Sequence, residues 1–163
     1  IIFEIFSNTC IHLESTKDIN GVEILGVIKN IYAILLGIVF EKFTSPNSQF
    51  MILSKVFNEI KILNNIFKGD NKTIFLACGL GDICLTSFNE LSRNRTLGKQ
   101  IAKGLYKSSE NNMNVIEGVN SLKIIFSLID VSTLKELPLL NKLFLFFDSE
   151  LDEFNIDLKE LFN

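Results

Sequence analysis

Two short polar stretches carry the residue types best suited to bind a small anion. In residues 79–86 (GLGDICLT), the carboxylate of Asp82 comes directly after two glycines. In residues 92–95 (SRNR), a hydroxyl, two guanidiniums and an amide begin ten residues after Asp82. Ser92 is a good N-cap, and a helix N-terminus beside Arg93 favours phosphate. The pattern predicts a site for a phosphate-bearing small molecule near Asp82; the alternative is a well-capped surface helix with solvated arginines.

A third candidate, Lys29, lies inside a strongly apolar stretch, residues 22–43. A lysine there either extends its ammonium to solvent or to a partner, or it is desolvated and fit to move protons. Asp82 is a candidate partner, because a carboxylate near a buried ammonium favours the charged form and fixes its orientation. Lys29 and Asp82 are therefore the first residues to test for acid–base chemistry.

The remaining candidate residues are more simply interpreted as structural than as catalytic or metal-binding. Glu117 stands at a predicted helix start, where the helix dipole favours an acid. His12 is the only histidine and the three cysteines lack CxxC spacing, so we expect no metal site and reduced cytosolic thiols. A net charge of −3 gives no general attraction to nucleic acid or to anionic membranes. At 163 residues and 47% hydrophobic content, the chain is expected to form one globular domain.

The elements that would position these residues are predicted to be almost entirely helical. Residues 1–14 alternate weakly and predict one or two short edge strands. Asp18 is a candidate N-cap for a helix over about residues 22–43 that is apolar nearly all round and therefore central. Its uninterrupted apolar run is too short to cross a bilayer, so we expect a buried helix and no membrane span. Gly26 and Gly37 within it suggest close packing of another backbone or of a ligand.

The rest of the chain predicts further helices separated by polar turns. The expected helices and connections cover residues 48–67, 72–78, a tight turn and short helix from 79, 93–106, 118–128, a linker over 131–138, and 139–147. Residues 148–163 are acidic and amphipathic and predict a terminal helix packed on the body. With no βαβ alternation and no GxGxxG, the sequence predicts an all-α domain of about seven helices.

Four blocks in order resemble one family. Residues 21–24 (GVEI) lead to Lys29 and Asn30; the GLGD and LT pairs follow at 79–82 and 85–86; SRNR at 92–95 is followed by a glycine; VIEG occupies 115–118. In this order the chain resembles the C-terminal, substrate-binding domain of NAD(P)-dependent glycerol-3-phosphate dehydrogenase. The resemblance covers about two thirds of the chain, and it implies an all-α multi-helix fold like that of the glycerol-3-phosphate and 6-phosphogluconate dehydrogenases.

The resemblance implies a role for each matching residue. Lys29 would accept the proton of the C2 hydroxyl when glycerol 3-phosphate is oxidised, and would donate it when dihydroxyacetone phosphate is reduced. The residues implied to place the substrate and Lys29 are Asn30, Asp82 and Thr86. Those implied to hold the substrate with its phosphate are Ser92, Arg93 and Asn94. The residues implied on the cofactor side are Arg93, Val115 and Glu117.

The resemblance also implies an incomplete enzyme. Residues 1–17 would be the tail end of a nucleotide-binding domain, residues 18–147 the helical substrate-binding domain, and residues 148–163 an acidic tail. NAD or NADP would be bound mostly by the other domain, so this chain alone should not turn over. A cytoplasmic location is implied, and a homodimer is compatible with the resemblance.

The sequence departs from the family in two places. Residues 41–46 stand where the family has a glycine-rich turn, and Ser54-Lys55 stand where it has a Thr-Arg pair. These changes bear on the local loop shape. The alternative to the dehydrogenase half, motivated by the missing cofactor domain, is a relict helical domain that acts as a non-enzymatic interaction or dimerisation module.

Overall fold

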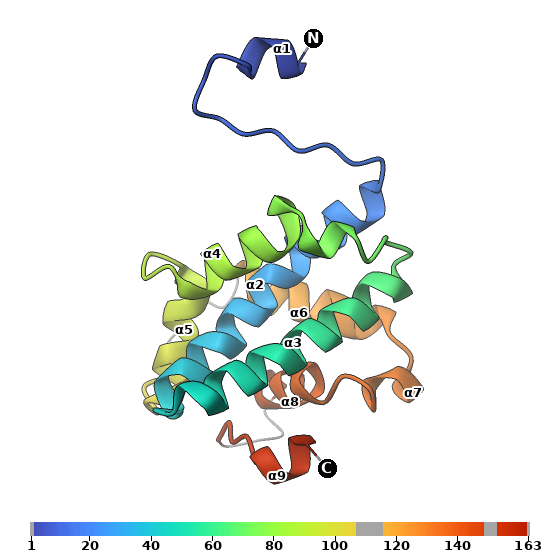
Figure 1. The fold of residues 1–163 in the computed structure, drawn as a ribbon. Helices are drawn as coiled ribbons and strands as arrows, with labels where there is room; N and C mark the ends of the chain where they lie inside the picture. Colours follow the sequence, from blue (N-terminus) through green and yellow to red (C-terminus); the bar gives the residue numbers. More distant parts are fainter. Residues whose placement is uncertain (1, 107–115, 149–152, 163) are drawn as a thin grey trace.

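The structure is a computed structural model that describes residues 2–106, 116–148 and 153–162. Within these ranges every regular element is helical, which confirms the all-α prediction. Figure 1 shows the helices gathered around α2, with α1 standing away from them at one end and α9 lying at the other. The elements are α1 (Ile2–Phe6), α2 (Ile19–Lys42), α3 (Pro46–Ile66), η1 (Thr73–Phe75), η2 (Ala77–Gly81), α4 (Asp82–Phe88), α5 (Arg93–Ala102), α6 (Glu117–Leu128), α7 (Val131–Leu134), α8 (Pro138–Phe147) and α9 (Leu158–Phe162).

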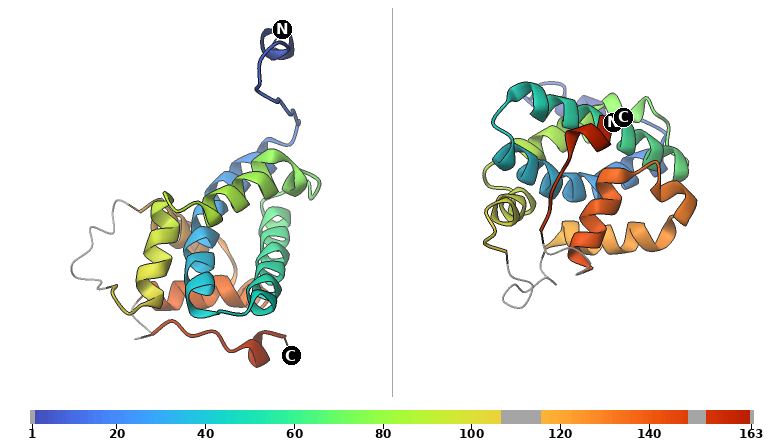
Figure 2. Two further views of the ribbon diagram at one scale, coloured as in Figure 1. Left: turned by 60° about the vertical axis from the view of Figure 1, so that its left-hand side comes forward. Right: turned by 90° about the horizontal axis from the view of Figure 1, so that it is seen from below.

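Helix α2 is the centre of the fold. It contacts α3, α4, α5 and α6, and the left view of Figure 2 shows it running between α5 and α3. By length and composition it could cross a membrane, with a mean hydropathy of 2.0 in its most apolar window, but 67% of that window is buried inside the fold. The burial confirms the prediction of a buried helix, because the other helices cover its apolar surface.

Asp18 fixes the start of α2. Its Oδ1 accepts from the backbone N–H of Gly21 at 2.9 Å, as predicted for an N-cap. Its Oδ2 accepts from the Thr73 hydroxyl at 2.6 Å and from the Asp70 N–H at 2.8 Å. The Thr73 hydrogen bond, followed by that from Gly21, lowers the pKa of Asp18 below its ordinary value. One carboxylate therefore joins the first turn of α2 to the segment that follows α3.

The crossing of α2 and α5 depends on two glycines. A Cβ at Gly98 would lie 2.1 Å from the carbonyl oxygen of Ile34, and one at Gly37 would lie 2.4 Å from that of Arg95. The prediction that another backbone packs closely is thus confirmed for Gly37. At Gly26 no such neighbour lies within 4 Å among the described residues, so the same prediction of close backbone packing was wrong there.

Two segments differ from the sequence-based expectation at the ends of the chain. Residues 1–14 were predicted as strands, but their described part, residues 2–14, contains the helix α1 and irregular chain. Here the hydroxyls of Ser7 and Thr9 each donate to a carbonyl three residues earlier, at 2.8 Å, and no described strand is available for pairing. Among the described residues of the C-terminal tail, Leu158–Phe162 is the helical part, while Phe154 is buried without lying in a helix.

Two further expectations needed correction. The predicted linker over 131–138 contains the one-turn helix α7. The helical spacing of Phe50, Leu53, Phe57, Ile60 and Leu63 predicts one apolar face on α3. This prediction was only partly right, because Phe50 is 55% exposed whereas Glu59 is 3% exposed. Helix α3 contacts both α2 and α8, and its buried residues are Ile52, Val56, Glu59, Ile60, Leu63 and Asn64.

Candidate active site

Lys29 and Asp82 form an ion pair between α2 and α4. Lys29 Nζ lies 2.6 Å from Asp82 Oδ2, although the residues are 53 positions apart in the chain. The side chains are 26% and 34% exposed, so the pair is partly screened from water yet open to a small molecule. The structure brings together the two residues that the sequence paired, with the ammonium held by one carboxylate oxygen.

The backbone before Asp82 forms a π-helical turn, η2, that ends at Gly81. A Cβ on Gly79 would lie 2.3 Å from the carbonyl oxygen of Ile74, so only glycine fits where η2 packs on η1. Asp82 then opens α4, and Thr86 Oγ1 lies one turn further, 3.5 Å from Asp82 Oδ1. The sequence predicted a tight connection here but not its π-helical form, which is common beside functional sites.

A chain of amide hydrogen bonds continues from the residue after Lys29. Asn94 Oδ1 accepts from the backbone N–H of Gly118 at 3.1 Å, and Asn94 Nδ2 donates to Asn30 Oδ1 at 2.9 Å. Because the Gly118 N–H is a donor, it fixes the orientation of the Asn94 amide and, through it, that of Asn30. Asn30 Nδ2 is thereby directed to Glu117, whose Oε2 lies 3.3 Å away. The starts of α5 and α6 are both joined to α2 at Asn30.

The start of α5 carries the predicted anion-binding residues. Ser92 caps the helix, its Oγ accepting from the Arg95 N–H at 3.3 Å. Arg93 follows at the first helical position with an exposed side chain, and no ion pair to another described residue involves it. A cation at a capped helix N-terminus is suited to an anionic ligand.

Arg95 is a supporting residue to which the sequence gave no role. Its guanidinium donates to the carbonyl oxygen of Phe88, the last residue of α4, at 2.9 Å, and to the carboxylate of Glu90. Glu90 also accepts from Lys99, and these hydrogen bonds lower its pKa below the ordinary value, that from Lys99 contributing most. The three side chains hold the α4–α5 connection between Asp82 and Arg93. The second guanidinium of SRNR, with Glu90 just before the motif, was the signal in the sequence that could have indicated this supporting role of Arg95.

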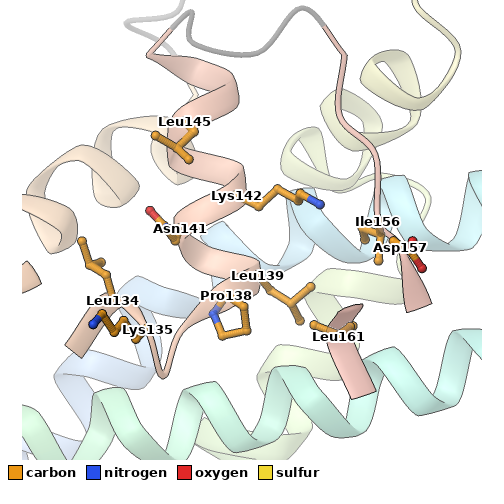
Figure 3. Close-up of a pocket in the computed structure, with 10 residues that line it drawn as sticks. All are labelled: Leu134, Lys135, Pro138, Leu139, Asn141, Lys142, Leu145, Ile156, Asp157 and Leu161. Carbon is orange, nitrogen blue, oxygen red and sulfur yellow. The ribbon is translucent and has the colours of Figure 1, made fainter. Parts of the chain in front are cut away.

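Of the predicted cofactor-side residues, Arg93 and Glu117 are exposed, the carboxylate of Glu117 accepts from the Asn30 amide, and Val115 lies outside the described residues. A cavity of about 360 Å³ lies elsewhere, among α7, α8 and the segment leading into α9, and Figure 3 shows its mostly apolar lining. No predicted site residue lines that cavity.

The helical fold and the order of the motifs define a C-terminal domain of the dehydrogenase class. The chain belongs to the family described as NAD-dependent glycerol-3-phosphate dehydrogenase C-terminus, whose sequence model matches residues 18–152. This confirms the resemblance found in the sequence, since all four of its ordered blocks lie inside the matched range.

Curated relatives and a solved structure agree with this family. The chain is 36% identical to glycerol-3-phosphate dehydrogenase [NAD(P)+] of Phytoplasma mali over 75% of its length and 39% of the relative. It is 35% identical to that of Methanothermobacter thermautotrophicus over 81% of its length and 40% of the relative. The crystal structure of glycerol-3-phosphate dehydrogenase from Coxiella burnetii superposes with a TM-score of 0.77 and 26% identity, covering 93% of this chain and 47% of that one. The chain thus spans less than half the length of these proteins.

Proposed function

We propose that this chain is the substrate-binding and catalytic-lysine half of an NAD(P)-dependent glycerol-3-phosphate dehydrogenase. The observation that carries the proposal is the ion pair between Lys29 and Asp82, 2.6 Å long and partly exposed, in the family's own sequence context. In this proposal residues 1–17 end a nucleotide-binding part, residues 18–147 form the substrate-binding domain, and residues 148–163 are an acidic tail.

In the proposed reaction Lys29 carries the proton at the substrate C2 oxygen. When dihydroxyacetone phosphate is reduced, the Lys29 ammonium donates a proton to the C2 carbonyl oxygen. When glycerol 3-phosphate is oxidised, the neutral amine takes the C2 hydroxyl proton. Asp82 orients Nζ, Thr86 contacts Asp82, and Asn30, the next residue on α2, would help to place the substrate. A bound dinucleotide would supply the hydride to C2 in the reduction and accept it in the oxidation.

The start of α5 would hold the substrate phosphate. Arg93 supplies the cation, Ser92 the hydroxyl of the cap, and Asn94 the amide that also positions Asn30. The dinucleotide would contact Arg93, Glu117 and Val115 along one edge, with most of it bound by another part of the protein. The retained charge pairing makes a relict interaction module the weaker explanation.

The proposal extends to the protein's surroundings. A cytoplasmic location agrees with free Cys10, Cys78 and Cys84, whose thiols form no disulfide in the described chain. A homodimer belongs to the proposal as well, and sedimentation of the purified chain measures it. A monomer at every accessible concentration would remove the dimer without touching the site.

Titration of this chain with glycerol 3-phosphate, followed by NMR chemical shifts, tests the anion site. We expect saturable shifts at residues 92–95 and a loss of affinity of at least tenfold in Arg93→Ala, because a charge-assisted contact is removed. Lys61→Ala, a change of an exposed lysine on α3, is the matched control and should bind as the parent chain does. An Arg93→Ala chain that binds as tightly as the parent would contradict the proposed phosphate contact.

A further inference from the structure

The carboxylate of Glu59 is buried among three helices and serves a purpose outside the candidate active site. Glu59 belongs to α3 and is 3% exposed. Its Oε1 accepts from the backbone N–H of Leu139 at 2.6 Å, and its Oε2 accepts from that of Leu140 at 3.0 Å. Its Oε2 also accepts from the hydroxyl of Tyr32 on α2, at 2.9 Å, and Tyr32 is fully buried. One side chain therefore joins α2, α3 and α8.

The start of α8 needs this carboxylate because its own sequence provides no cap. The N-cap position is Leu137, whose side chain has no hydrogen-bonding group, and Pro138 has no N–H to satisfy. The next two backbone N–H groups, of Leu139 and Leu140, are the free donors of the first turn. Both donate to Glu59, which replaces a local cap with one supplied from 80 positions earlier in the chain.

The same turn of α8 is enclosed from its other sides. Figure 3 shows Pro138 and Leu139 near Leu134 of α7 and Leu161 of α9, all lining one cavity. Leu139 and Leu140 are each 1% exposed. Water therefore has little access to the N–H groups, so loss of the carboxylate would leave them unsatisfied.

Burial and donors act on the Glu59 carboxyl in opposite directions. Burial raises its pKa to about 7, while the N–H groups of Leu139 and Leu140, the Tyr32 hydroxyl and the charge of Lys55 each lower it. Lys55 lies one turn earlier on α3; the groups that face the carboxyl from α2 and α8 are the Tyr32 hydroxyl and the backbone donors. The burial of the charge outweighs the donors.

We propose that Glu59 is a proton-linked clamp. Its carboxyl joins the start of α8 to α2 and α3, and the binding of a proton to this carboxyl increases the stability of the folded state. The ionised form satisfies all three donors at the cost of a buried charge. The neutral form removes that charge, keeps a carbonyl acceptor for α8, and allows the Tyr32 hydroxyl to accept from the carboxyl O–H. The folded chain therefore holds this proton at a higher pH than the unfolded chain does.

The sign of the pH effect follows from this difference. The ordinary pKa of glutamate is 4.5, against about 7 in the fold, so the folded state binds the proton more tightly. The contribution of Glu59 to stability is complete below pH 4.5 and is lost as the pH rises through 7. Between pH 5 and pH 8 the folding equilibrium constant should fall roughly 50- to 100-fold on account of this group.

Urea unfolding of the chain from pH 5 to pH 8 tests the clamp. We expect Glu59→Gln to remove the fall in the folding constant across this range, because an amide does not titrate. Glu23→Gln, a change of an exposed acid on α2, is the matched control and should keep the parent profile. Parallel profiles for the parent chain and Glu59→Gln would overturn the proposal.

A titration of the parent chain covers the case in which Glu59→Gln does not fold. The carboxyl carbon of Glu59, followed by NMR, should titrate with a midpoint near pH 7, and the amide shifts of Leu139 and Leu140 should follow the same midpoint. A carboxyl midpoint near 4.5, or amides of α8 that do not respond, would reject the clamp whatever the fate of the variant.

Discussion

Asp82 and Glu59 are two carboxylates that bind side chains of the same helix in opposite surroundings. Asp82 pairs with Lys29 near the surface, where both side chains are about a quarter to a third exposed. Glu59 binds Tyr32, only three positions further along α2, where both residues are essentially inaccessible to water. In Figure 1 the α8 end of the bundle, which Glu59 fastens, lies opposite the α4 end that carries Asp82.

The comparison teaches how one helix holds both an exchangeable contact and a fixed one. A partly exposed ion pair contributes little net stability, so a ligand oxygen can replace one partner at small cost. A buried carboxylate with three donors cannot give up a partner without leaving a desolvated group. Changes at the first site should therefore affect chemistry more than folding, and changes at the second should do the reverse.

The largest expected effect is that of Lys29→Ala on turnover. In the chain joined to a nucleotide-binding half, we expect kcat to fall about 10²- to 10⁴-fold, because the proposed proton carrier at C2 is lost. The free energy of unfolding of the isolated chain should change by less than about 1 kcal/mol, as for a partly exposed ion pair. Steady-state kinetics and urea unfolding measure the two quantities.

The same lysine change also provides the sharpest way to break the comparison. Near-normal turnover in Lys29→Ala would show that Lys29 does not carry the proton. A loss of folding as large as that at a buried site would show that the pair is structural. Lys61→Ala, on the exposed side of α3, should alter neither measurement.

Asn94→Ala should give an intermediate effect, because this site residue is itself buried. Asn94 is 7% exposed and binds both Asn30 and the N–H of Gly118. Removal of its amide leaves that N–H unsatisfied and should lower the free energy of unfolding by about 2 kcal/mol, measured in urea. Asn120→Ala, at an exposed position of α6, is the matched control; equal stabilities for the two variants would contradict the role given to Asn94.

Tyr32→Phe should have the smallest effect and should sharpen the contrast through its pH dependence. The change removes one donor from the Glu59 carboxyl and keeps the ring that fills the core. The free energy of unfolding should fall by about 1 kcal/mol at pH 8, where the carboxylate is ionised, and by less at pH 5. Urea unfolding of Tyr32→Phe and of the parent chain at pH 5 and pH 8 measures this difference. A larger loss of stability at pH 5 would contradict the hydrogen bond from Tyr32 to the ionised carboxylate of Glu59.

The long helices could be predicted from the sequence because their signals are local. The apolar run after Asp18 gave α2, and the turns at Pro46 and Pro138 gave the starts of α3 and α8 to within two residues. The first residues were assigned to strands wrongly, since weak alternation cannot show whether a partner strand exists. The π-helical turn η2 could not be predicted either, because it depends on how Gly79 packs against η1.

The contacts among the candidate site residues could be predicted only in part from the sequence. The sequence paired Lys29 with Asp82, and the structure places their charged atoms in contact. The family resemblance implied that Asn94 binds the substrate. The described contacts of the Asn94 amide are with Asn30 and Gly118, so a contact with substrate stays a proposal. Glu59 escaped prediction because its burial is decided by α8, far along the chain, and nothing nearby marks an acid as a cap for a distant helix.

The two glycines at the crossing of α2 and α5 have a consequence for how the domain tolerates change. At both Gly37 and Gly98 the backbone of the other helix lies directly beside the glycine, so neither position has room for a side chain. A single added methyl group at either position would push α2 and α5 apart. Arg93 begins the same helix that carries Gly98, so such a change would shift the start of α5, and Arg93 with it, relative to α2. The position of Arg93 relative to α2 thus depends on two residues without side chains, Gly37 and Gly98.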